Sequence, residues 1–203
     1  MNDKMTSVED DLAFMRSLAQ PSDASQRVFG QLYFAAGLCY SVQMVGHAIH
    51  ALAGLQGPFW GFLIGAGPSV VFLIALVWIL RRNRGAPPPV ATSKAVGAIF
   101  RAVGLANLFL VVVVGSIAWR EQSLTIWLIY PCTVMVLQGA AWLAAYYLRR
   151  QPWLAVVAYG WLLTGVAMAL SVDNNLAFIA ATGFGLFAFM LVPGAVIMRQ
   201  RGD

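Results

Sequence analysis

Residues 31–52 read QLYFAAGLCYSVQMVGHAIHAL, a largely apolar stretch that includes several polar residues. A helix rises about 1.5 Å per residue and the hydrocarbon core of a bilayer is about 30 Å thick, so a stretch of this length and apolarity can span a membrane. The same stretch carries both histidines of the chain, His47 and His50, together with other polar residues. We therefore expect it to form the first transmembrane helix, and the most polar one.

The composition of the whole chain agrees with a membrane protein. Of its 203 residues, 60% are hydrophobic and 10% are charged, and its mean hydropathy is +0.74. Soluble domains carry charges at about a quarter of their positions. The dyad alternation of a β-barrel is absent. The sequence predicts an all-α membrane protein, a six-transmembrane-helix bundle made of three helical hairpins. The expected spans are residues 29–53, 59–80, 97–118, 124–148, 153–171 and 176–198.

The positive charges predict the orientation. Arginines and lysines gather between the second and third spans, between the fourth and fifth, and after the sixth, whereas the other loops carry little positive charge. By the positive-inside rule, both termini are cytoplasmic in a multi-pass protein of the bacterial inner membrane. The predicted regions are a cytoplasmic segment at 1–27, a transmembrane domain at 28–198 and a cytoplasmic tail at 199–203. The net charge of +5 is dispersed over helix ends, which argues against nucleic acid as a partner.

The N-terminal segment predicts a short amphipathic helix over residues 7–19. Thr6 and Glu9 fit a capping box, and apolar residues recur at helical spacing from Val8 to Ala19. This helix either lies along the lipid bilayer and its own bundle or docks onto a cytoplasmic protein partner.

The second span predicts a helix-packing face. Gly57, Gly61 and Gly65 recur every four residues, which lets a neighbouring backbone approach closely, and Pro68 follows as an expected kink. The packing partner is either another helix of the monomer or a second copy, so we expect a homo-oligomer.

The first span also predicts an intramembrane polar or ligand site. Met44, His47 and His50 share one helix face, because positions three apart are neighbours on a helix. Ionisable residues inside a membrane are costly and mark functional sites. The other candidate residues are Tyr40, Gln43, Asn107 and Gln138. The alternative is that these residues only form hydrogen bonds between helices, or that the histidines lie near the outer headgroups.

We expect no cofactor, and the alternative is a metal or haem site at His47 and His50. Imidazole and thioether groups bind copper, and two histidines can begin a zinc site, but the spans contain no Asp or Glu to complete one. Two histidines one turn apart cannot ligate one haem iron from both sides, which leaves His/Met, five-coordinate or intersubunit haem. Cys39 and Cys132 are expected to be reduced thiols.

The motifs of familiar enzymes do not occur in the sequence. HExxH, GxSxG and GxxxxGK are all absent, so we expect no catalysis. A non-enzymatic regulatory or scaffolding membrane component is the leading interpretation. The alternative is a small permease or channel for a neutral or lipophilic solute, since several spans contain proline and glycine. A polar crevice beside His47 would favour the permease, and a closed, dry bundle would favour the scaffold.

Overall fold

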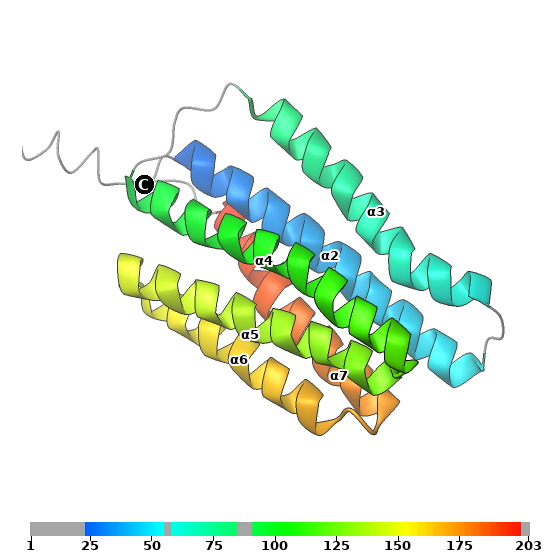
Figure 1. The fold of residues 1–203 in the computed structure, drawn as a ribbon. Coiled ribbons are helices and arrows are strands. Elements are labelled where there is room, and N and C mark those ends of the chain that lie inside the picture. The colour runs from blue at the N-terminus through cyan, green and yellow to red at the C-terminus, as the bar shows by residue number, and fades with distance from the viewer. Residues whose placement is uncertain (1–22, 55–57, 85–90, 200–203) are drawn as a thin grey trace, which may run out of the picture.

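A computed structural model describes residues 23–54, 58–84 and 91–199, and all of its regular structure is helical (Figure 1). Six helices are long and apolar enough to cross a membrane, which confirms the predicted class at that level. The predicted helix over 7–19 lies outside the described residues. The elements are α2 (Asp23–Ala53), α3 (Pro58–Arg82), α4 (Ala91–Glu121), α5 (Leu124–Arg149), α6 (Pro152–Leu170), α7 (Asn175–Leu186), the π-helix η1 (Phe187–Leu191) and α8 (Val192–Arg199).

Local signals set several helix ends. The Ser123 side chain accepts a hydrogen bond from the Ile126 N–H at the start of α5, and Asn174 caps α7 in the same way. Pro152 occupies the first turn of α6, where a missing N–H costs nothing. Arg150 ends α5 in the left-handed conformation, with φ of 56°. Short turns therefore join α4 to α5 and α5 to α6.

The helices divide into a packed group and two peripheral helices. α2 lies against α3 on one side and against α7, η1 and α8 on another, while α6 packs between α5 and α7. α4 lies along α5 (Figure 1). Among the described side chains, α3 buries only Ile79, and α4 buries only Val96 and Ala118. α3 and α4 therefore leave most of their apolar surface outside the core.

One end of the bundle collects the positive charge, and we call it the basic end. α2, α4 and α6 begin there and α3, α5 and α8 end there (Figure 1). Its basic residues are Arg27, Arg81, Arg82, Arg84, Lys94, Arg101, Arg149, Arg150 and Arg199. Between residues 23 and 199 the acidic residues are Asp23, which begins α2, and two at the opposite end: Glu121, which ends α4, and Asp173, in the turn after α6.

The helices differ from the expected spans at their boundaries. α2 begins at Asp23 rather than at residue 29, and α4 begins at Ala91 rather than at residue 97. Hydropathy detects the apolar part of a helix, whereas the helical hydrogen bonds continue into the polar flanks. The last span is interrupted by η1, where the Val192 N–H donates to the Phe187 carbonyl five residues back. The wider turn precedes Pro193, whose ring would crowd the carbonyl four residues earlier in a regular helix.

Glycines mark the closest helix crossing of the bundle. A Cβ added to Gly37 would lie 2.7 Å from the Leu191 Cα, and one added to Gly194 would lie 2.7 Å from the Phe34 Cα. Both contacts involve backbone, so neither can relax cheaply. α2 and the η1–α8 segment therefore touch backbone to backbone.

The predicted glycine face of the second span has a different environment. A Cβ at Gly61 or Gly65 would meet no atom of the described chain within 4 Å, and Gly57 lies outside the described residues. The space beside these two glycines is open within the described monomer, so packing across a homo-oligomer stays a prediction.

Candidate functional site

The polar residues of α2 follow one face of the helix. Tyr33, Tyr40, Gln43, His47 and His50 are separated by steps of three, four and seven residues, which place them on one stripe. We call these five residues the polar stripe. It runs from the basic end of the bundle toward the opposite end.

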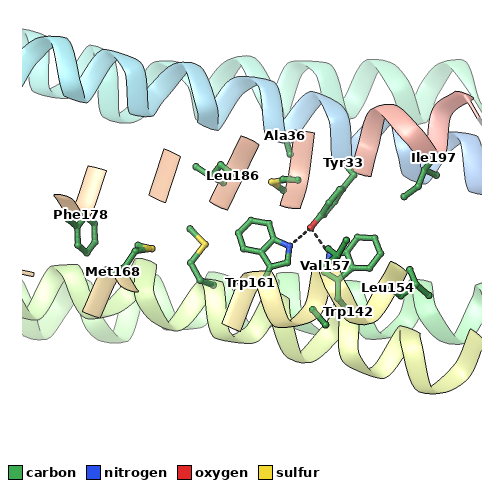
Figure 2. Close-up of a cluster of buried hydrophobic side chains, with 13 residues drawn as sticks. Tyr33, Ala36, Trp142, Leu154, Val157, Trp161, Met168, Phe178, Leu186 and Ile197 are labelled. Atoms are coloured by element: carbon green, nitrogen blue, oxygen red, sulfur yellow. Dashed lines mark hydrogen bonds between the residues drawn. The ribbon is translucent and has the colours of Figure 1, made fainter. Parts of the chain in front are cut away.

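The stripe begins in the hydrophobic core with a buried hydrogen-bonded triad. The Tyr33 hydroxyl accepts one hydrogen bond from Trp142 Nε1, at 2.6 Å, and another from Trp161 Nε1, at 2.9 Å. Figure 2 shows the two indoles converging on this oxygen from α5 and α6. Both lone pairs of the hydroxyl are used, and both indole donors are satisfied. The triad therefore ties three helices together at one atom.

Aromatic rings close the space around the triad. Phe29 stacks on Tyr33 with ring centroids 5.6 Å apart, and Phe100 of α4 lies 5.1 Å from Phe29 and 5.3 Å from Trp142. The large rings fill the region where α2, α4 and α5 approach one another. This part of the bundle is consequently a packed aromatic cluster with the Tyr33 hydroxyl inside it.

The middle of the stripe attaches α3 to α2. The Tyr40 ring lies 5.7 Å from that of Phe72, and Gln43 Nε2 donates to the Gly65 carbonyl at 3.1 Å. Pro68 has no N–H, so the turn of α3 that precedes it lacks one internal hydrogen bond. Gln43 supplies a donor to that turn, as neighbouring helices do at prolines inside membranes. The structure thus gives Gln43 a helix-packing role.

His47 and His50 occupy the far end of the stripe. Both side chains are half-buried, and neither forms a hydrogen bond within the described part of the chain. Met44 does not share their surroundings, because it packs on α7, where a Cβ at Gly183 would lie 3.3 Å from the Met44 Cβ. Across residues 23–54, 58–84 and 91–199, no cluster of three or more His, Cys, Asp or Glu side chains is present that could hold a metal.

Asn107 and Gln138 stand apart from the hydrogen bonds of the stripe. Asn107 Oδ1 and Gln138 Oε1 are both buried, and neither has a hydrogen-bond partner among the described residues. The Ser41 hydroxyl oxygen is in the same state. A buried polar group without a partner costs free energy, so these three oxygens weaken the bundle in this form.

Two hollows of the surface lie away from the polar stripe. One is at the turn between α4 and α5, where Trp119 and Trp127 line it. A second follows the outward face of α3 from Val70 to Arg81. Neither contains His47 or His50.

Sequence reasoning missed Trp142 and Trp161, which with Tyr33 form the most buried polar contact. A signal did exist, since both indoles fall inside spans rather than at their ends, and a buried indole N–H needs an acceptor. Which acceptor it finds depends on the packing of helices far apart in sequence.

The chain was compared with family models, with curated proteins and with solved structures, and it matches none of them. The functional conclusions therefore depend on the geometry alone. The main features are the aromatic cluster around Tyr33, the proline-bearing helix α3 that is hydrogen-bonded to Gln43, and the two peripheral apolar helices α3 and α4.

Proposed function

We propose that this chain is a non-enzymatic, multi-pass component of the bacterial inner membrane that regulates or scaffolds partner proteins. In this proposal the six apolar helices form three hairpins across the bilayer, and the basic end faces the cytoplasm with both termini. Six helices of sufficient length and a basic cluster at one end support this orientation. Reporter fusions at Asp203 and at Gln56 test it, and an external reporter at Asp203 would overturn it.

The outward face of α4 is the observation that carries the scaffolding role. Ala98, Ala102 and Ala106 are exposed at every fourth position, with exposed Leu105 and Phe109 beside them. Small residues at this spacing allow close approach of a second helix in a membrane. The opposite face of α4 already packs into the bundle through Phe100 and Ala118. α4 therefore presents a surface suited to a partner's transmembrane helix.

Photo-crosslinking in intact membranes tests this surface. A benzoylphenylalanine at Phe109 of α4 is compared with one at Leu163 of α6, since the two positions are 66% and 68% exposed. We expect a discrete protein adduct from Phe109, lost in the Ala102→Leu background, and only lipid adducts from Leu163. Lipid adducts alone at both positions would contradict the proposal.

A small permease or channel is the second candidate, and the far end of the polar stripe favours it. His47 and His50 are half-buried without hydrogen bonds to described residues, and Gly61 and Gly65 have open space beside them. Reconstituted liposomes are assayed for glycerol-driven swelling with the wild type and with His47→Ala/His50→Ala. Swelling above that of empty liposomes, lost in the variant, would replace scaffolding by transport as the function.

The metal or haem alternative is tested on the same proteins. Bound copper and zinc and the Soret absorbance are measured on the wild type and on His47→Ala/His50→Ala. We expect both proteins to give the same values, because the described residues bring no third ligand to the pair. A stoichiometric metal or a Soret band that disappears in the variant would restore the metal site.

A further inference from the structure

The outward face of α3 carries a groove with an uneven chemistry. It is lined by Val70, Leu73, Ile74, Val77, Trp78 and Arg81. These residues are three or four positions apart and so form one stripe of the helix. The groove is apolar along its whole length except at the basic end of the bundle, where it reaches Arg81.

The length of the groove matches half of a bilayer. Val70 and Arg81 are separated by a helix segment of about 16 Å at about 1.5 Å per residue, and one leaflet of a hydrocarbon core measures about 15 Å. With Arg81 at the headgroup level, Val70 lies near the bilayer midplane. The groove therefore spans the acyl region of one leaflet.

The positive charge at its end comes from two neighbouring arginines. The Arg82 guanidinium lies over the Trp78 ring at 5.2 Å from the ring centroid, which holds a second cation next to Arg81. Among the side chains that the structure describes, neither arginine has a carboxylate partner, and Glu121 and Asp173 belong to the opposite end. Within this part of the chain the two guanidiniums are available to an external anion.

We propose that this groove is a binding site for one anionic phospholipid of the leaflet at the basic end. One acyl chain lies along Val70, Ile74 and Val77, and the phosphate lies between the guanidiniums of Arg81 and Arg82. Guanidinium groups form charge-assisted, bidentate hydrogen bonds with phosphate. A zwitterionic headgroup has no net negative charge and is therefore attracted less strongly to two arginines. The site depends on the proposed membrane orientation, but it is independent of the partner surface on α4.

A second copy of the chain fits this groove less well than a lipid. Two copies inserted in the same direction and related by a two-fold axis would bring Arg81 and Arg82 of one copy against the same residues of the other. Like charges at that distance repel.

Native mass spectrometry of the full chain in detergent tests the site. Phosphatidylglycerol is titrated against phosphatidylcholine with identical acyl chains, using the wild type, Arg81→Gln/Arg82→Gln and the matched control Lys94→Gln/Arg199→Gln. The control removes the same charge from the same end, at two exposed positions outside the groove. Ile74→Trp keeps both arginines but fills the apolar part, and size-exclusion profiles show that each variant is folded.

We expect one tightly held phosphatidylglycerol per wild-type chain. Its affinity should fall by about 30-fold in Arg81→Gln/Arg82→Gln, because each basic residue near anionic lipid contributes about 1 kcal/mol. Lys94→Gln/Arg199→Gln should retain the wild-type affinity, and Ile74→Trp should lose it despite its unchanged charge. Equal losses in both double variants would reduce the effect to overall charge and overturn the site. Absence of a preference for phosphatidylglycerol, or a dimer that Ile74→Trp dissociates, would also overturn it.

Discussion

Tyr33→Phe removes the one oxygen on which two buried indoles converge, and its effect can be worked out from the structure. The ring keeps its place, because it stacks on Phe29 at 5.6 Å and packs against Trp142 at 5.1 Å. The hydroxyl disappears, and the donors of Trp142 and Trp161 lose their acceptor. The substitution thus changes hydrogen bonding with little change in shape.

Two scales bound the expected loss of stability. In soluble proteins each buried donor left without a partner costs about 1–3 kcal/mol. Side-chain hydrogen bonds inside membrane bundles average about 0.6 kcal/mol and reach about 1.7 kcal/mol, since the unfolded reference state in the membrane also finds partners. For two bonds in the proposed membrane bundle the second scale applies, and the free energy of unfolding should fall by about 1–3 kcal/mol.

Reversible unfolding in mixed micelles measures this change. Tyr159→Phe is the control, because Tyr159 lies on α6 with 55% of its surface exposed. A double-mutant cycle between Tyr33→Phe and Trp161→Phe isolates one bond, with an expected coupling of about 0.6–1.7 kcal/mol. If Tyr33→Phe is as stable as Tyr159→Phe and the cycle is additive, the hydroxyl does not hold these helices together.

Two further pairs of substitutions probe helix packing and the amide side chains. Gly37→Ala should lower the free energy of unfolding by about 1–3 kcal/mol through overpacking against the Leu191 backbone. Gly61→Ala is the control and should be neutral or stabilising, because the space beside Gly61 is open. Equal effects of the two substitutions in the same unfolding assay would refute the assigned crossing. Gln43→Leu should destabilise by about 1 kcal/mol because the hydrogen bond from α2 to the Gly65 carbonyl is lost. Gln138→Leu should be neutral or stabilising, since its buried oxygen has no described partner. A large loss of stability in Gln138→Leu would show that this amide is in fact bonded.

Hydropathy was sufficient to find the six long helices, because every backbone group in a membrane span must be bonded within the helix and only long apolar runs satisfy that demand. The same apolarity gave no information on which helices pack together, because a helix that is apolar all round does not reveal which face lies inside the bundle. Regular glycine spacing pointed to Gly61 and Gly65, beside which the described monomer leaves open space, while the close crossing uses Gly37 and Gly194.

The candidate site stays a prediction, although some of its residues form contacts between helices. The polar stretch of the first span does carry the interhelical hydrogen bonds, including the one from Gln43. The donors to Tyr33 come from residues 109 and 128 positions away, and no local pattern encodes such a meeting. The π-helix was likewise beyond a sequence reading, because Pro193 predicts a disturbed turn but does not determine how the chain relieves it.

The position of α2 between its immediate successor α3 and the distant α8 sets an order on assembly. Gln43 can bond to Gly65 as soon as the second helix is inserted, whereas Tyr33 gains its donors only after α5 and α6 have arrived. The face of α2 that bears Gly37 remains uncovered until the η1–α8 segment follows. A nascent chain stopped after α5 therefore leaves Tyr33 with one of its two donors and the Gly37 face of α2 uncovered.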